Sequence, residues 1–598
     1  MAFGASATAH GFPVASHAND CADCDNRMAR VKPQESNSDE RKIYDGSWLS
    51  FPRSSDISRS PIYVTHQNSP STEPIGTIPN SAPTFASWES SYPLINEHGL
   101  AFGESTTNAK VVLAAAGINH EYPNKTRGSA MFAISSLMAV ALERCKTARC
   151  AITTMGQLAE RFGFFGESFG ASEALAIIDK NEAWIFEITG DGSAIGALWA
   201  AQRVPGDHVA VLANSMIIGD IDFDSPDFIT STNLINKTTE LGLYHGGVFN
   251  WRKTLSADAG QPLYAALRMW RVFSQVSSFK LPVPKPGEFA DYPFSVKVDA
   301  PLSIEQIFNL HRDHYEGTEF DMTQGVMAGP WGNPNYEFTG LEFRQVPGQA
   351  PRAISIMRTS YCQVATSGSL AKVWYAADAP ATSVFVPFYA IADDYSDTFG
   401  SSQGPSLKKF DRTSAFWAFD FVANWMGLNY RNMSIEMVYP ARDELQAFVM
   451  GEAAKAEKEA VEAPGEAREI LGRAQTIIQS HVVQKWWELA DDLIVRYNDG
   501  LFNFGEAQPQ SAGALPYPSW WLRMIGFNAD FYKPGHHWVM PAGPEAFAAA
   551  SRGSQPSPPP QSVIPYFVIF ALAPIFFILG FRQGKVKRKG DLSESLIL

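Results

Sequence analysis

One run of side chains restricts the fold of this 598-residue chain more than any other feature. Residues 563–581 read VIPYFVIFALAPIFFILGF and include no charged side chain. At about 1.5 Å per residue, a helix of this length measures about 28 Å, close to the thickness of the hydrocarbon core of a bilayer. Five cations follow the run: Arg582, Lys585, Lys587, Arg588 and Lys589. The pattern predicts a single transmembrane helix.

The charges behind this run predict its orientation. Cations are enriched on the cytoplasmic side of membranes, so residues 582–598 are expected to form a basic cytoplasmic tail. Residues 506–562 read as an extension that ends in a Pro/Ser-rich stalk, SRGSQPSPPPQS. We therefore predict a single-pass membrane protein of the secretory or endolysosomal system or of the cell surface. Its C-terminal helix contacts the lipid bilayer, and the rest of the chain is lumenal or extracellular.

If most of the chain lies on the lumenal or extracellular side, it must be transported across the membrane. The opening, MAFGASATAHGFPV, has neither a positively charged leader nor an apolar segment of signal-peptide type. Either the C-terminal run is a tail anchor, or the natural protein has sequence upstream of Met1. A tail anchor would have to move a very large body across the membrane after synthesis, so we expect upstream sequence. Sequons at Asn124, Asn236 and Asn432 fit a glycoprotein.

Composition excludes several classes of function. A hydrophobic content of 45% and a charged content of 18% are typical of a globular protein with a large core. A net charge of −14 without a basic stripe in the body argues against nucleic-acid binding. Cys21 with Cys24, and Cys145 with Cys150, are spaced for local disulfides. No second pair or spaced histidines complete a zinc site, so we expect no metal and no cofactor.

Two regions differ in their secondary-structure pattern. Up to residue 440, short strands such as FPVAS, NEAWIFEIT, VAVLANSMII, KVWYAA and SVFVPFYAI alternate with helical segments at 129–146 and 261–278. This predicts an α+β domain over 1–440 with layered sheets and helices. Residues 441–463 and 465–499 are long helical runs on either side of Pro464-Gly465. We expect residues 441–505 to be a helical part of the same catalytic unit.

Seven stretches resemble peptidase family C69, the cysteine dipeptidases related to secernins and penicillin-V acylases. They are NEAWIFEIT, AAQRVPGDHVAVLAN, RMWRVFS, DMTQGVMAGPWGNP, AADAPATSVFVPFYA, SAFWAFDFVANW and KWWELADDLIVRYNDG. They occur in the family's order over roughly residues 1–505. The resemblance implies a four-layer αββα Ntn-hydrolase sandwich, here with a C-terminal helical extension and the transmembrane helix. It implies hydrolysis of dipeptides as the reaction.

The resemblance also implies an N-terminal cysteine nucleophile whose own α-amine acts as the base. Related enzymes have a glycine shortly after that cysteine, and Gly4 matches it. Counting back, the cysteine falls about three residues before Met1 and is absent from this chain. Cys21, Cys24 and Cys362 are rejected as substitutes, because none can become N-terminal without loss of a strand.

The other site residues follow by position from the same resemblance. Asp20 matches the carboxylate that holds the nucleophile's amine, and His17 stands where relatives have arginine. Asn214 matches the amide donor of the oxyanion hole. The resemblance matches Arg268 to the active-site cation, with Arg271 as the less favoured alternative. Substrate binding is assigned to Glu173, which could hold the free amine of a dipeptide.

Two other functions remain open at this point. The same nucleophile chemistry cleaves other amides in penicillin-V and bile-salt acylases, so the substrate could be an acyl amide. The chain as written could also be a membrane-anchored pseudoenzyme, because loss of a nucleophile removes most of the rate while the fold survives.

Overall fold

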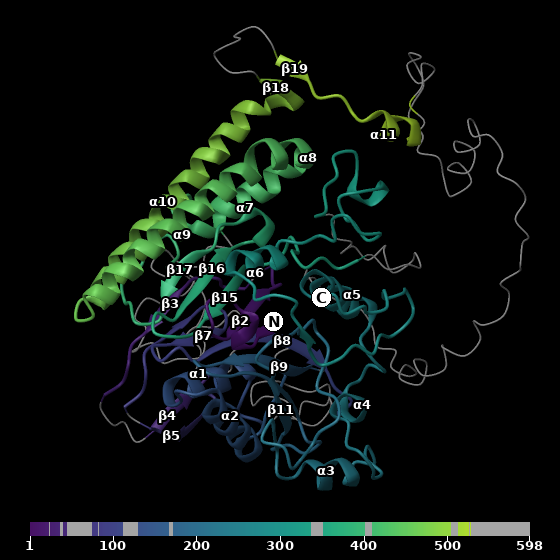
Figure 1. Ribbon diagram of the computed structural model, residues 1–598, viewed down its shortest axis with the longest axis vertical. Helices are drawn as coiled ribbons and strands as arrows, with labels where there is room; N and C mark the ends of the chain where they lie inside the picture. The colour runs from purple at the N-terminus through teal and green to yellow at the C-terminus, as the bar shows by residue number, and fades with distance from the viewer. Residues whose placement is uncertain are drawn as a thin grey trace, which may run out of the picture. The chain divides into compact units, whose positions relative to one another are not determined.

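The computed structural model describes residues 1–22, 24–35, 40–44, 74–81, 83–111, 129–166, 171–335, 351–400, 409–503, 512–525 and 527. Contacts divide the chain into two units, Met1–Trp521 and Leu522–Leu598. The two large sheets and all the predicted site residues belong to the first unit, which is α+β (Figure 1).

The first sheet has seven strands and is antiparallel throughout. In spatial order these are β14 (Val296–Lys297), β12 (His208–Ala210), β1 (Ala2–Phe3), β2 (Val14–Asn19), β15 (Tyr361–Thr366), β16 (Lys372–Ala377) and β17 (Val386–Tyr389). The short β1 therefore lies between β12 and β2. Because both neighbours run antiparallel to β1, they are parallel to each other and end at the same edge of the sheet.

The second sheet has eight strands and is also antiparallel. In order they are β13 (Phe228–Thr230), β11 (Leu198–Val204), β10 (Ala183–Thr189), β9 (Ala171–Ile178), β8 (Ala101–Asn108), β7 (Pro93–Asn96), β6 (Ser87–Glu89) and β3 (Ala29–Val31). Two small hairpin-like sheets pair β4 (Glu40–Ile43) with β5 (Gly76–Pro79), and β18 (Leu501–Asn503) with β19 (Ala512–Ala514).

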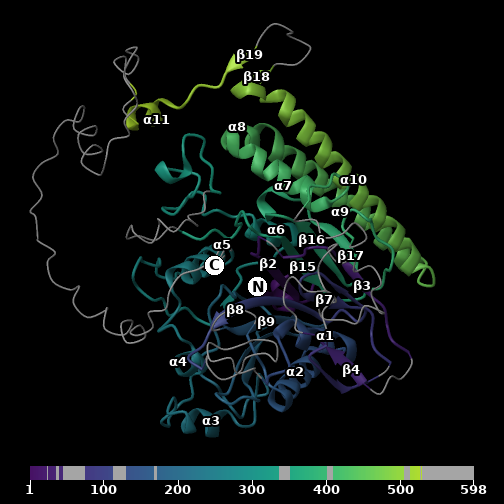
Figure 2. The ribbon, with the colours of Figure 1, turned by 180° about the vertical axis from the view of Figure 1, so that it is seen from behind.

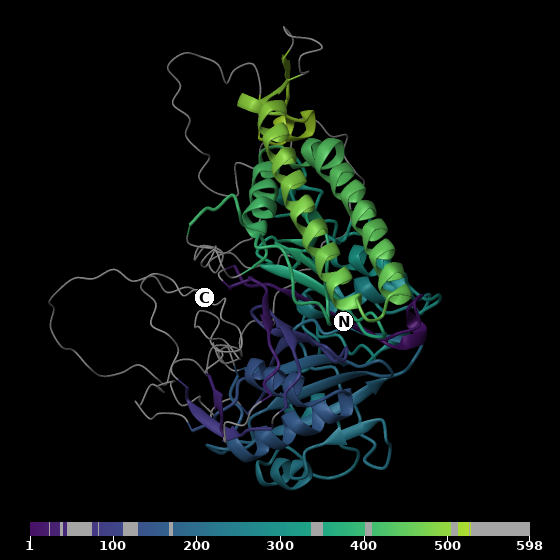
Figure 3. The same ribbon diagram turned by 90° about the vertical axis from the view of Figure 1, so that its left-hand side faces the viewer.

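The described helices differ widely in length. They are α1 (Ile134–Arg144), α2 (Ala148–Phe162), α3 (Leu234–Glu240), α4 (Trp251–Leu255), α5 (Leu263–Val276), α6 (Ile304–His311), α7 (Ala415–Trp425), α8 (Tyr430–Met433), α9 (Tyr439–Glu462), α10 (Ala467–Arg496) and α11 (Ser519–Met524). Figure 3 shows the long α9 and α10 side by side as two green helices. They match the helical runs predicted over 441–463 and 465–499.

The two sheets pack face to face between two groups of helices (Figures 1 and 2). Side chains along a strand alternate between the two faces. In β9, Ala176 and Ile178 join the core shared with the seven-stranded sheet. Leu175 and Ile177 instead pack in the core formed with α1 and α2. The outer face of the seven-stranded sheet is covered by α6, α7 and α10.

Two predictions about the membrane are wrong. The predicted fold included a single transmembrane helix, and the predicted location was a single-pass membrane protein that contacts the bilayer through it. No helix in the described part of the chain combines the length and the apolar character needed to cross a membrane. Residues 563–581 themselves lie outside the described residues. An apolar run shows only that its side chains avoid water, whereas a span also requires a helix that pairs every backbone group.

One strand is shorter than predicted. The pattern VAVLANSMII predicts a strand over 209–218, and β12 ends at Ala210. Its last residue, Ala210, pairs with Ala2 of β1. A strand needs extended backbone, and Asn214 has a φ of +58°, so the segment turns there and the strand does not continue.

Candidate active site

Three of the predicted site residues come together at one edge of the seven-stranded sheet. Asp20 directly follows β2, Asn214 follows the segment after β12, and Arg268 projects from α5. Since β2 and β12 end at the same edge, residues almost two hundred positions apart reach the same place. This juxtaposition is the candidate active site.

Asn214 is fixed by four hydrogen bonds. Its backbone N–H donates to Ser105 Oγ at 3.1 Å, and its Nδ2 donates to the carbonyl of Thr106 at 2.9 Å. Its Oδ1 accepts from Arg268 Nη2 at 3.0 Å, and its carbonyl accepts from the hydroxyl of Tyr264 at 3.4 Å. An asparagine amide has two N–H bonds, so the second can be directed at a substrate oxygen.

Arg268 is held close to Asn214 by the backbone. Its Nε donates to the carbonyl of Tyr264, and its Nη2 to the carbonyl of Ala213, both at 2.9 Å. Burial, followed by the nearby charge of Arg352, lowers the pKa of Arg268 to about 10. The guanidinium is therefore still charged at neutral pH. Its position supplies positive charge beside the predicted amide donor.

The carboxylate of Asp20 has two side-chain partners. Arg352 Nη2 donates to Oδ2 at 2.9 Å, and Thr359 Oγ1 donates to Oδ1 at 3.0 Å. Arg358 Nη1 donates to the backbone carbonyl of Asp20 at 2.8 Å. Neither Arg352 nor Thr359 was predicted from the sequence. Both are more than three hundred residues from Asp20 in the chain, and no local motif marks them.

Two alternatives considered from the sequence occupy different surroundings. Arg271 forms a 2.6 Å ion pair with Asp313, so Arg268 is the arginine that lies beside Asn214. His17 has its Nε2 3.4 Å from a carboxylate oxygen of Glu104. The ring also packs edge-on against aromatic neighbours, including Tyr361.

Glu173 belongs to the eight-stranded sheet, whereas Asp20 follows a strand of the seven-stranded sheet. It lies in β9, is fully buried, and pairs in register with Thr106 of β8. By alternation it shares the face of Leu175 and Ile177, which pack in the core with α1 and α2. Its assignment to the substrate's amine stays a prediction.

The cysteines form two local disulfides. Cys21 is bonded to Cys24 and Cys145 to Cys150, as their spacing predicts. Cys362 in β15 is a buried free thiol, and burial raises its pKa well above the ordinary range. A thiol in that state is a poor nucleophile at neutral pH.

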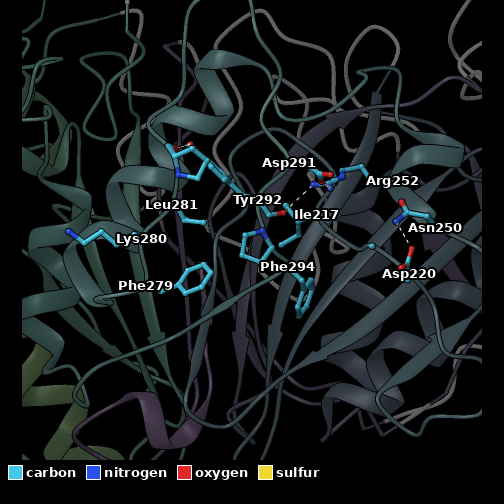
Figure 4. Close-up of a pocket in the computed structure, with 13 residues that line it drawn as sticks. Ile217, Asp220, Asn250, Arg252, Phe279, Lys280, Leu281, Asp291, Tyr292 and Phe294 are labelled. Carbon is cyan, nitrogen blue, oxygen red and sulfur yellow. Dashed lines mark hydrogen bonds and ion pairs between the residues drawn. The ribbon is translucent and has the colours of Figure 1, made fainter.

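A separate pocket lies beside the segment that continues from Asn214 (Figure 4). Its volume is about 460 Å³, and Ile217, Gly219 and Arg252 are among the residues that line it. An ion pair between Arg252 and Asp291 spans part of its wall. None of Asp20, Asn214 or Arg268 lines this pocket, so it is distinct from the candidate site.

The chain is similar to a known enzyme family and to several bacterial proteins. The model of peptidase family C69 matches residues 72–439, a range that includes Asn214 and Arg268 and begins after Asp20. The chain is 26% identical over 305 residues to a probable dipeptidase of Latilactobacillus sakei, covering 48% of this chain and 56% of that one. It is 28% identical over 317 residues to a probable dipeptidase of Salmonella dublin, covering 51% and 64%.

A third relative is the probable dipeptidase B of Lactococcus lactis, 24% identical over 291 residues, with 47% of this chain and 55% of that one covered. The chain thus spans less than two thirds of the length of these relatives. The family match, in contrast, extends over more than half of the present chain. On that match, the chain belongs to peptidase family C69.

Proposed function

We propose that this chain is the catalytic body of a cysteine-type dipeptidase that uses an N-terminal nucleophile. The observation that carries the proposal is the convergence of Asp20, Asn214 and Arg268 where β2 and the segment after β12 end. The three side chains supply an anion for an amine, a donor for an oxyanion and a cation for a thiolate. The printed names of the relatives support dipeptides as the substrate class.

The register of β1 supports a position for the missing nucleophile. Ala2 pairs with Ala15 on β2 and with Ala210 on β12. The main chain of Met1 continues this register, because its N–H donates to the carbonyl of Ser16 at 2.7 Å. Each further step back moves the partner one step forward on β2. The third residue before Met1 would lie opposite Asn19, at the end of the sheet where Asp20 and Asn214 also lie.

That position agrees with the cysteine expected from the family pattern. Its α-amine would lie next to Asp20, which follows Asn19 directly. In the proposed reaction the thiol attacks the carbonyl carbon of the peptide bond, and its proton passes to the α-amine. The amide of Asn214 stabilises the oxyanion. The proton then moves to the departing amine, and water hydrolyses the thioester and restores the thiol.

The proposed catalytic unit comprises residues 1–440 with 441–505 as its helical part. Buried glutamines support the assignment of the helices to the same unit, because they join the long helices to the sheet. Gln475 Oε1 accepts from the backbone N–H of Tyr389 in β17 at 2.8 Å. Gln446 accepts from the N–H of Phe385 and donates to its carbonyl, both at 3.0 Å. Such contacts make α9 and α10 part of the sheet's outer cover.

The test is expression of the protein with its native upstream sequence. N-terminal sequencing of the mature protein should find cysteine three residues before Met1. A panel of dipeptides should be hydrolysed, and replacement of that cysteine by alanine should abolish the activity while dipeptides still bind. Hydrolysis of acyl amides in place of dipeptides would indicate an acylase. A mature protein without an N-terminal cysteine, or one that binds dipeptides without turnover, would indicate a pseudoenzyme.

A further inference from the structure

The candidate site contains more positive than negative charge. Arg352 forms an ion pair with Asp20 at 2.9 Å. Arg268 donates only to neutral groups, the carbonyls of Tyr264 and Ala213 and the amide oxygen of Asn214. No carboxylate lies within ion-pair distance of Arg268 in the part of the chain that the structure describes. Arg268 and Arg352 thus have one ion pair between them, that of Arg352 with Asp20, and a ligand with a negative charge would balance the charge of Arg268.

The two guanidinium groups lie near each other. The charge of Arg352 lowers the pKa of Arg268, and the charge of Asp20 raises it. Like charges at this range repel each other, and the repulsion falls when an anion binds between or beside them. A site of this kind is electrostatically prepared for an anionic group of the substrate.

Arg352 has N–H donors that are more available to a ligand than those of Arg268. Its side chain is 25% exposed, and its Nη2 binds Asp20. Its Nε is buried and has no hydrogen-bond partner among the described residues. A guanidinium has five N–H donors, and two adjacent ones fit a carboxylate in a bidentate arrangement. A buried donor without a partner is costly unless a ligand completes it.

The backbone at Arg352 is also held in place. The hydroxyl of Tyr315 donates to the Arg352 carbonyl. Tyr315 is fully buried and has a φ of +66°, a conformation that a bulky residue adopts only where its surroundings enforce it. Asp313 fixes this turn by accepting from the Tyr315 N–H at 2.8 Å. Arg352 is therefore presented by a rigid support.

We propose that Arg352 binds the α-carboxylate of the dipeptide substrate and so selects peptides with a free C-terminus. The inference rests on the proposed dipeptidase function. In a dipeptide the carboxylate is one residue from the scissile carbonyl, at most roughly 3.6 Å further along the chain. Its receptor must therefore lie close to the oxyanion donor Asn214, and Arg352 lies in the same site, bonded to Asp20 at 2.9 Å.

The competing explanation is that Arg352 only holds Asp20. The two explanations differ in how one variant treats two substrates. Arg352→Gln should be assayed on L-alanyl-L-leucine and on L-alanyl-L-leucinamide, in the full chain with its upstream cysteine. Loss of support for Asp20 slows both reactions alike. Loss of a carboxylate receptor slows only the first, so the ratio of the two kcat/KM values isolates it.

We expect the acid-to-amide ratio to fall roughly 10- to 100-fold, the range for loss of a charge-assisted hydrogen bond. Arg352→Lys should restore part of the ratio, because lysine returns the positive charge without the two adjacent N–H donors of a guanidinium. It also serves as the test if the glutamine variant does not fold. Arg203→Gln is the matched control, since Arg203 is a partly exposed arginine paired with Asp227 and its loss should leave the ratio unchanged. A ratio in Arg352→Gln within twofold of the wild type would overturn the proposal.

Calorimetric titration separates this inference from the proposed function. If the wild type hydrolyses neither peptide, the dipeptidase function fails, and binding of the same two probes still decides the role of Arg352. Weaker binding of only the free acid in Arg352→Gln supports the carboxylate receptor. Equal weakening of both probes, or no change in either, contradicts it.

Discussion

The backbone of Asn214 has a φ of +58°, a left-handed conformation that most residues avoid and that asparagine adopts more readily than most. The turn brings its N–H to Ser105 and its side chain to Thr106 and Arg268. One residue type thus meets two demands, a left-handed turn and an amide donor. The two demands can be separated by mutation.

We expect Asn214→Gly to retain the turn and remove the donor. In the active protein kcat should fall about 10²- to 10³-fold with little change in KM, as for the loss of an oxyanion donor. Asn214→Ala should lose activity similarly and also melt at a lower temperature, because alanine is strained at positive φ. Steady-state kinetics and thermal unfolding measure the two effects. A glycine variant with wild-type kcat would exclude the assigned role.

Glu187 in β10 holds the segment that continues from Asn214. One carboxylate oxygen accepts from the N–H of Ile217 at 2.6 Å and of Ile218 at 3.3 Å. Burial raises the pKa of Glu187 to about 7, although the two N–H groups and Arg252 oppose the shift. A buried acid with a raised pKa binds its proton more tightly in the folded state. The free energy of unfolding therefore falls as the pH rises from about 4.5, the pKa of this group in the unfolded chain, to about 7, its pKa in the folded protein.

Replacement of Glu187 by glutamine should remove this pH-dependent cost. The measured quantity is the free energy of unfolding of Glu187→Gln minus that of the wild type. We expect this difference to be more favourable to the variant at pH 8 than at pH 4.5, by on the order of 2 kcal/mol. Denaturant unfolding at both pH values measures the difference. Glu462→Gln, at an exposed site, should show none. An identical pH response in Glu187→Gln and the wild type would mean that Glu187 is ionised without penalty.

At the scale of the elements, α2 packs on the eight-stranded sheet through a glycine. A Cβ atom at Gly156 would lie 2.2 Å from the indole of Trp199 in β11. That indole cannot easily move away, because its Nε1 donates to Glu160 Oε1 at 2.7 Å. The close approach of helix and sheet therefore depends on the missing side chain.

Gly156→Ala should destabilise the protein by about 1–3 kcal/mol, the usual cost of overpacking a core. The matched control is Gly451→Ala in α9, where a Cβ atom would meet nothing within 4 Å. There the higher helix propensity of alanine should stabilise the protein by up to about 1 kcal/mol. Urea unfolding of both variants measures the contrast. Equal effects at the two positions would show that α2 can shift on the sheet.

Elements with strong local patterns could be predicted from the sequence. The runs at 441–463 and 465–499 became α9 and α10, and NEAWIFEIT became β10, because periodicity and β-branched content act within a few residues. The end of β12 could not be predicted, since the turn at Asn214 is held by Ser105 and Thr106 of the distant strand β8. Nor could Arg352 be assigned to Asp20, because their contact arises only when strands distant in sequence are assembled. The transmembrane prediction relied on the length of an apolar run and on the cations that follow it, and it was wrong.

At the scale of the whole molecule, the edge strand β17 is covered by the long helices. An exposed strand edge presents unpaired backbone groups that promote aggregation. Here Gln479 of α10 donates to the carbonyl of Pro387 at 2.9 Å and accepts from the N–H of Ser396 at 2.8 Å. Gln475 accepts from Tyr389, as described above. Both glutamines are fully buried, so these bonds replace contacts that water would otherwise make.

This arrangement predicts that α9, α10 and the sheets unfold together. Gln475→Leu and Gln479→Leu leave a buried N–H without an acceptor, so each should destabilise the full chain by about 1–3 kcal/mol. Gln484→Leu, at an exposed position of the same helix, should have almost no effect. Far-ultraviolet dichroism follows the helices, and thiol labelling of Cys362 follows the seven-stranded sheet that buries it. If α9 and α10 belong to the catalytic unit, both signals change at the same urea concentration in every variant. If the helices form a separate unit, the dichroism change comes first, and the glutamine variants shift it without moving the labelling transition.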